Sequence, residues 1–208
     1  MTDLAWPLVV LIGLVVMVGA YVQAVVGLGI GLLSAPVIAL VDPSLVPDLP
    51  LWLALLISGL NLLDEHEHVD WPSTAWSLPA RLPGTFVGAW LVVAFTERQI
   101  GVVLAVMVLV AVAISVRTVE VPLKPATLAT AGFVAGATGT ATSIGGPPIA
   151  LLYQRGHPEV VRATLSVFFF VGVIMSLVGL AITGALDREP SLLALVLAPG
   201  VLVGFVAG

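Results

Sequence analysis

The chain has no cysteine and very few charged residues. Of its 208 residues only 9% are charged, whereas 60% are hydrophobic, and the mean hydropathy is +1.19. Soluble domains carry about 25% charged residues, so this chain has too little charge to cover a water-facing surface. The absence of cysteine excludes disulfides, thiolate catalysis and cysteine-ligated metal sites. The composition therefore predicts an all-α integral membrane protein.

Other absences narrow the function. No basic segment precedes the first apolar run, so we expect no cleavable signal peptide. No Asp, Glu, Lys or Arg falls deep inside a predicted span, which argues against an intramembrane carboxylate relay and favours facilitated anion movement or a proton carried by the substrate. His66, His68 and His157 fall in predicted loops, so Ser143 has no base at membrane depth, and no His-Glu-x-x-His motif occurs. We expect no enzyme, no cofactor and no nucleic-acid partner.

Apolar stretches separated by turns or charge clusters predict a bundle of about seven to nine helices. Crossing a bilayer takes about 20 residues, so the segments 30–41 and 147–153 are too short to cross alone. Both follow a glycine-rich break, and we expect them to be half-helices that meet near the membrane midplane. The predicted helices cover about residues 7–26, 30–41, 50–63, 77–95, 100–116, 126–137 or slightly beyond, 147–153, 160–184 and 191–208.

The two glycine-rich breaks fall at corresponding places in two halves of the chain. Gly27-Leu28-Gly29-Ile30-Gly31 leads to Pro36, and residues 139–146 lead to Pro147 and Pro148. This order predicts an internal repeat, with residues 1–116 and 126–208 as its halves and 117–125 as the linker. Because the first half contains five predicted segments, the second half starts on the opposite side, which predicts an inverted repeat.

The basic residues predict the orientation of the chain. The side richer in Lys and Arg is expected to be cytoplasmic, which places the amino terminus outside a plasma-membrane protein. That side carries Arg81, Arg117, Lys124, Arg155 and Arg162, whereas the other carries Arg98 and Arg188.

The last predicted helix ends without a polar flank, and the fifth helix of the first half has no counterpart in the second. We therefore expect the second repeat to lack its last helix, in a chain that is either naturally short or a fragment.

The breaks are the candidate substrate site. Glycines let a ligand approach the backbone, and a helix that starts after such a loop directs free N–H groups at the ligand. The second break adds hydroxyls, and no carboxylate is nearby, so the site favours a small anion. The candidate substrate-binding residues are Gln23, Gly27, Gly29, Gly31, Ser34, Pro36, Ser58, Asn61, Thr138, Thr140, Thr142, Ser143, Gly145, Gly146, Pro147 and Pro148.

Several of these polar residues have a second interpretation. Gln23, Ser58 and Asn61 suit interhelical hydrogen bonds as well as ligand contact. For the two Gly-x-x-x-Gly pairs, at 84–88 and 132–136, we prefer close helix packing.

Two other functions are kept as alternatives. The stretch 138–146 could act as the filter of a channel-like anion pore. His66 and His68, in the acidic segment 64–70, could bind a metal ion in a divalent metal permease, although a solvated connector is the favoured interpretation and no metal site is expected.

Residues 27–36 resemble the first glycine-rich motif of the sulfite exporter TauE/SafE family, and Ile144-Gly145-Gly146-Pro147-Pro148 resembles its repeated counterpart. Arg162-Ala163-Thr164, His68-Val69-Asp70-Trp71 and the 83–88 motif are also similar to the family. The resemblance implies an inverted-repeat permease for sulfite, sulfonates, thiosulfate or small carboxylates, working in the lipid bilayer. The oligomeric state is left open, and a homo-oligomer is compatible with the sequence.

Overall fold

The computed structural model describes residues 6–116, 121–154 and 156–208, and within these ranges the chain is all-helical. The all-α class is therefore confirmed. The helices are α1 (Trp6–Val26), α2 (Ile30–Val41), α3 (Asp48–Glu65), α4 (Trp71–Ala94), α5 (Glu97–Val116), α6 (Pro125–Thr142), α7 (Gly146–Leu152), α8 (Pro158–Thr183) and α9 (Arg188–Ala207), with short 3₁₀ turns at Pro43–Leu45 and His66–His68. By length and apolar composition, α1, α8 and α9 can each cross a membrane.

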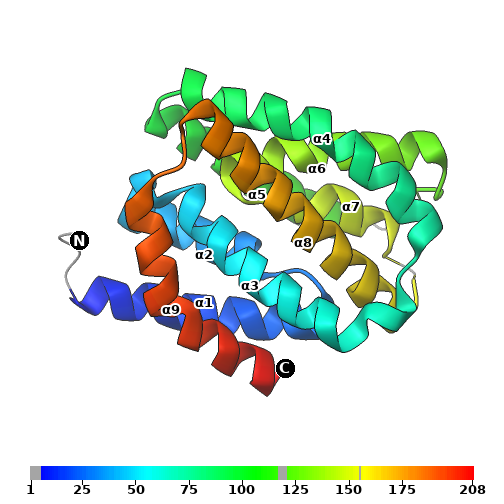
Figure 1. The fold of residues 1–208 in the computed structure, drawn as a ribbon, viewed down its shortest axis with the longest axis horizontal. Helices are drawn as coiled ribbons and strands as arrows, with labels where there is room; N and C mark the ends of the chain where they lie inside the picture. Colours follow the sequence, from blue (N-terminus) through cyan, green and yellow to red (C-terminus); the bar gives the residue numbers. More distant parts are fainter. Residues whose placement is uncertain (1–5, 117–120, 155) are drawn as a thin grey trace.

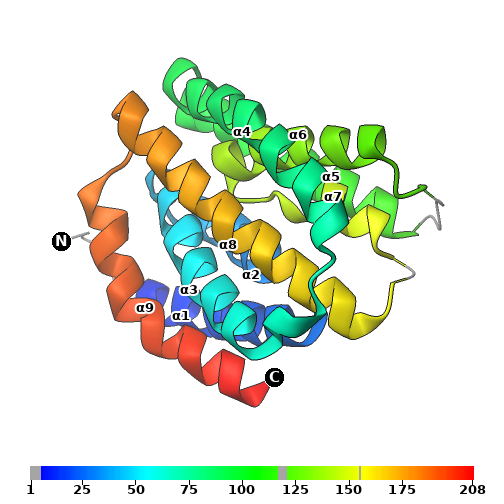
Figure 2. The same cartoon turned by 45° about the vertical axis from the view of Figure 1, so that its right-hand side comes forward.

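The helices form two groups joined by α8. Helices α1, α2, α3 and α9 pack together in one group, and α4, α6 and α7 lie together in the other, next to α5 (Figures 1 and 2). Helix α8 runs between them and contacts both α3 and α4. The largest apolar core lies among α1, α2, α3, α8 and α9. This arrangement leaves the space between the groups for a site that both of them line.

Small residues hold α4 and α6 in close contact. A Cβ added at Gly84 would overlap the Phe133 carbonyl, and one added at Gly132 would overlap the Ser77 carbonyl. The backbones therefore approach so closely that a side chain has no room at either position. The packing interpretation of these glycines is confirmed.

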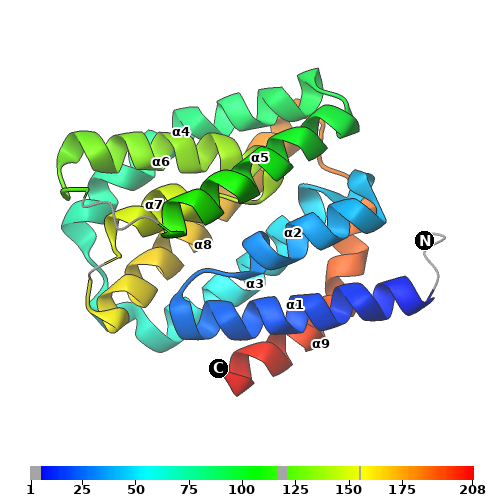
Figure 3. The same ribbon diagram turned by 180° about the vertical axis from the view of Figure 1, so that it is seen from behind.

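The chain leaves helical geometry between α1 and α2, as Figure 3 shows, and again between Thr142 at the end of α6 and Gly146 at the start of α7. Gly27 has φ +88° and Ser143 has φ 63°, both in the left-handed region. A residue with a Cβ rarely adopts that region, and the Ser143 hydroxyl compensates by donating to the Pro47 carbonyl at 2.7 Å. Gly31 packs directly on the Ser143 carbonyl, so the two breaks touch.

Helix α4 corrects the sequence analysis. It begins at Trp71, six residues before the predicted start at 77, because the Asp70 carboxylate accepts from Ser73 N–H at 3.2 Å and Pro72 occupies the first turn. Arg81 therefore lies near the middle of a helix and is only 1% exposed. The expectation that Arg81 lies near a helix end is wrong: it is an ionisable residue buried in mid-helix, so it does not mark one side of the membrane.

Polar contacts gather the loops at opposite ends of the helices. At one end Arg162 Nε donates to Glu65 at 2.6 Å, and Asp70 N–H donates to the Thr164 hydroxyl at 2.9 Å. Elsewhere, Asp187 N–H donates to the buried Asp48 carboxylate at 2.7 Å, at the other end of α3 and α8. Arg117, Arg155 and part of the 117–125 linker lie outside the described residues.

Candidate functional site

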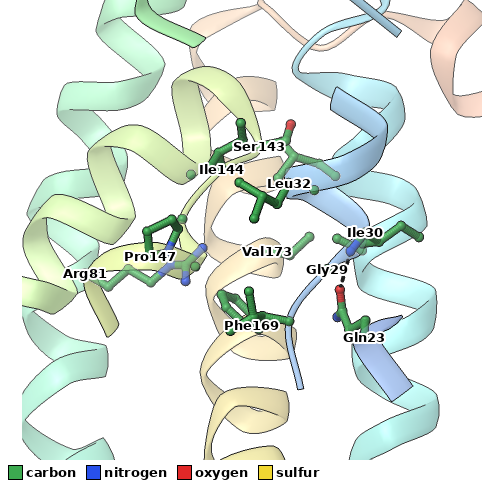
Figure 4. Close-up of a pocket in the computed structure, with 17 residues that line it drawn as sticks. Gln23, Gly29, Ile30, Leu32, Arg81, Ser143, Ile144, Pro147, Phe169 and Val173 are labelled. Atoms are coloured by element: carbon green, nitrogen blue, oxygen red, sulfur yellow. Dashed lines mark hydrogen bonds between the residues drawn. The ribbon is translucent and has the colours of Figure 1, made fainter. Parts of the chain in front are cut away.

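A small cavity of about 40 Å³ lies where the two breaks meet (Figure 4). A buried water needs about 10–15 Å³ on this measure, so the cavity has room for a few water-sized groups. Both groups of helices and α8 contribute to its walls. The lining residues are Gln23, Leu28, Gly29, Ile30, Gly31, Leu32, Leu51, Ala54, Arg81, Gly139, Ser143, Ile144, Gly145, Gly146, Pro147, Phe169 and Val173.

Arg81 reaches this cavity from α4. Figure 4 shows its side chain extending toward the cavity beside Pro147, on the side opposite Gln23. The guanidinium lies over the Phe168 ring, 4.7 Å from the centroid, and its one hydrogen bond to the described residues is a long one of 3.4 Å, which it donates to the Phe168 carbonyl. Its Nε has no hydrogen-bond partner in the described part of the chain.

Glycines of the neighbouring helices make the space for this side chain. A Cβ added at Gly172 on α8 would overlap the guanidinium itself. One at Gly136 on α6 would overlap the Arg81 carbonyl and approach its Cγ at 3.0 Å. The side chain thus passes through a slot that exists because α6 and α8 have no side chains at these positions.

The cavity carries an unbalanced positive charge. Arg81 is the one charged side chain among the described residues that line it, and no carboxylate lies beside the guanidinium there. An unpaired charge held away from water is costly, and an oxyanion can both neutralise a guanidinium and accept its N–H groups. The cavity therefore has the chemistry of an anion site.

The family model for the sulfite exporter TauE/SafE matches residues 10–208, almost the whole chain. The chain belongs to the sulfite exporter TauE/SafE family. This family consists of membrane exporters of sulfite and related anions, which agrees with the apolar helices and with the buried arginine. The family resemblance drawn from the glycine motifs is confirmed. Neither the curated proteins nor the solved structures gave a match.

Gln23 forms the wall opposite Arg81 in this member of the family. Its side-chain oxygen accepts from Ile30 N–H at 3.0 Å, at the start of α2 (Figure 4). Its side-chain amide nitrogen donates to Ser58 Oγ at 3.2 Å, while the Asn61 side-chain amide donates to the main-chain carbonyl of Gln23 at 3.2 Å. Ser58 and Asn61 therefore lie behind Gln23 and hold it in place, and neither lines the cavity.

The structure brings together part of the predicted site. Seven of the candidate residues line the cavity: Gln23, Gly29, Gly31, Ser143, Gly145, Gly146 and Pro147. The others do not line it: Gly27, Ser34, Pro36, Ser58, Asn61, Thr138, Thr140, Thr142 and Pro148.

The hydroxyls outside the cavity have partners of their own. Ser34, Thr138 and Thr142 each donate to the carbonyl four residues earlier in the same helix, at 2.5, 2.9 and 2.8 Å. Thr140 pairs with Ser176 at 2.8 Å and so joins α6 to α8. These hydroxyls therefore form hydrogen bonds within and between the helices that surround the cavity, and they do not face it.

A larger cavity of about 480 Å³ adjoins the first one. Leu28, Leu32 and Pro147 line both, so these apolar side chains separate the two spaces. Arg162 and Tyr153 lie at the walls of the larger cavity. Burial raises the pKa of Tyr153 to about 12, so its hydroxyl stays protonated and contacts the Asp70 carboxylate at 3.3 Å.

The acidic segment 64–70 lies where α3 ends and α4 begins. Among the described residues there is no group of three or more His, Asp or Glu that could hold a metal ion. His68 lies 3.6 Å from Glu159, and both side chains are largely exposed.

Arg81 is the site residue that the sequence analysis missed. The signal that could have found it is Asp70-Trp71-Pro72, a capping residue two positions before a proline, which is typical of a helix start. A helix that begins there places Arg81 about three turns in, away from both helix ends.

Proposed function

We propose that this member of the TauE/SafE family is a permease for small sulfur-containing or organic anions, of the sulfite, sulfonate, thiosulfate or carboxylate type. The observation that carries the proposal is the buried Arg81 at the meeting point of the two breaks, with no carboxylate beside it. Arg81 would bind the anion through charge-assisted hydrogen bonds, which are about twice as strong as neutral ones.

The rest of the cavity suits a compact anion as well. Its walls are mostly apolar, which strengthens an ionic contact relative to the same contact in water. Gln23 and Ser143 supply the other polar side chains, and glycines let a ligand approach the backbone. A metal cation would meet the positive guanidinium in this space, which counts against the metal permease.

We further propose that transport proceeds by alternating access around the breaks. Leu28, Leu32 and Pro147 separate the Arg81 cavity from the larger one, and these residues lie in or next to the non-helical segments. A change in backbone direction at the breaks would move them and open the smaller cavity to one side. The inverted repeat, the plasma-membrane location and an external amino terminus are parts of the same proposal.

The test is uptake of ³⁵S-sulfite, ³⁵S-thiosulfate, ¹⁴C-sulfoacetate and ¹⁴C-acetate into proteoliposomes that contain the purified protein. We expect Arg81→Gln to lower uptake of every transported anion by at least about tenfold, since loss of a buried charge contact costs about 1.5–3 kcal/mol or more. Arg98→Gln is the matched control, because Arg98 is an exposed arginine outside the cavity. Uptake that is the same in wild type, Arg81→Gln and protein-free vesicles would refute the proposed function.

A further inference from the structure

We propose that the protein is an anion exchanger, which crosses between its two open states readily when an anion is bound and slowly when it is empty. The inference rests on the proposed function, since it takes the Arg81 cavity as the place where the anion is carried. It adds the mode of transport: the protein returns with a second anion instead of returning empty.

The first observation is that the fixed charge in the cavity has no local compensation. Arg81 is 1% exposed, and guanidinium groups keep their proton in proteins. Around it the described residues supply the Phe168 carbonyl, which accepts one long hydrogen bond from Arg81, and the face of the Phe168 ring. Both are weak substitutes for an anion or for water.

The second observation is that none of the described residues lining the cavity is an Asp or Glu, and that nearby carboxylates have other partners. Glu65 is bonded to Arg162, and Asp70 accepts from Ser73 N–H at the start of α4. Asp48 accepts from Asp187 N–H near the other end of the molecule. None of these acids lines the cavity, so an internal ion pair does not form in the structure described here.

The third observation is the small size of the cavity next to the guanidinium. The glycine slot at Gly136 and Gly172 surrounds the Arg81 side chain closely, and the cavity in front of the guanidinium holds only a few water-sized groups. Few waters can therefore stay with the charge when the site is closed. A bound monoanion would fill this space and cancel the charge at once.

These observations have a kinetic consequence. Alternating access passes through a state that is closed to both sides, and in this protein the empty closed state holds an isolated charge. The loaded closed state holds a neutral pair, so its energy is lower relative to the open states. Crossing is therefore faster with an anion bound. An anion on the far side should accelerate uptake by at least about tenfold, which is the rate ratio that a 1.4 kcal/mol difference between the two crossing barriers produces.

The experiment compares two kinds of proteoliposomes that contain the full chain. One kind is loaded with unlabelled sulfite and the other with an equal concentration of an impermeant buffer anion, with the membrane potential clamped to zero. The initial rate of ³⁵S-sulfite entry should be at least tenfold higher into the sulfite-loaded vesicles. Equal rates in an active protein would overturn the exchange mode and leave the permease function standing, whereas absence of any uptake would overturn both.

Two variants connect the rate ratio to Arg81. Arg81→Lys keeps the positive charge and should keep a ratio well above one, even if its affinity falls. Arg81→Gln, assayed at raised sulfite concentration, removes the charge, and its residual rates should become equal in the two kinds of vesicles. A ratio that stays high in Arg81→Gln, or that is lost in Arg81→Lys, would overturn the assignment of the exchange mode to the charge of Arg81.

Thr85→Val, one turn along α4 from Arg81, is the control for packing changes and should leave the ratio of the two uptake rates unchanged.

Discussion

At the scale of single residues, the site depends on one arginine and on the glycines that admit it. Arg81 occupies a buried slot in which Gly172 leaves the space for the guanidinium. The same residue type at an exposed helix start, as at Arg98 in the first turn of α5, contributes mainly to solubility and orientation. In the proposed function, the role of Arg81 therefore comes from its surroundings, and Gly172 acts as a positioning residue.

The prediction at this scale is that Gly172→Ala weakens anion transport. The added methyl group would overlap the Arg81 guanidinium and force it from the slot, and such overpacking costs about 1–3 kcal/mol. We expect at least about fivefold lower sulfite uptake, with a rise in KM rather than loss of inserted protein. Gly101→Ala, where an added Cβ has no neighbour within 4 Å, should behave as wild type.

A double variant separates positioning from general damage. If Gly172 acts through Arg81, then adding Gly172→Ala to Arg81→Gln should lower uptake no further. A second, full loss in the double variant would show that Gly172 has a separate structural role.

At the scale of elements, the sequence predicts the helices better than the site. The glycine breaks, the short α2 and the short α7 follow directly from Gly, Pro and segment length, and α2 has the predicted bounds of 30–41. Helix α4 was placed too late because Pro79 and Pro83 and its polar first turns mask the apolar pattern. With the predicted start at 77, Arg81 lies near a helix end. An arginine in that position does not indicate a binding site, so the sequence did not mark Arg81 as a site residue.

The hydroxyl-rich part of the second break shows a different limit. Thr138, Thr140 and Thr142 lie close to the second break in the sequence. However, α6 continues to Thr142, so their hydroxyls bond to helix carbonyls or to Ser176. Which hydroxyl faces a cavity depends on where a helix ends, and helix ends are the least certain part of a sequence-based prediction. Gln23 and the glycines next to the breaks do not have this ambiguity, because they adjoin the break itself.

At the scale of the whole molecule, the loops fall into two sets. The contacts of Glu65 with Arg162 and of Asp70 with Thr164 join one set, and the contact of Asp48 with Asp187 joins the other. By sequence alone, the proposed cytoplasmic side without Arg81 still carries Arg117, Lys124, Arg155 and Arg162, against Arg98 and Arg188 on the other. Arg117 and Arg155 lie outside the described residues, so the orientation stays a proposal that rests on the sequence.

The prediction at this scale concerns labelling from outside the cell. Because the chain has no cysteine, single-cysteine variants can be made without background. A membrane-impermeant maleimide should label Thr96→Cys in intact cells and should label Lys124→Cys only after the cells are permeabilised. Labelling in the opposite order would reverse the proposed orientation.

The central claim is that an anion binds at Arg81 between the two breaks. Its most direct test is a crystal structure of the protein soaked with selenite, which resembles sulfite and gives an anomalous selenium signal. We predict one dominant selenium peak in the cavity, with selenite oxygens at hydrogen-bonding distance from the Arg81 guanidinium, and no such peak in Arg81→Gln. A dominant peak at another place, or an unchanged peak in Arg81→Gln, would contradict the account.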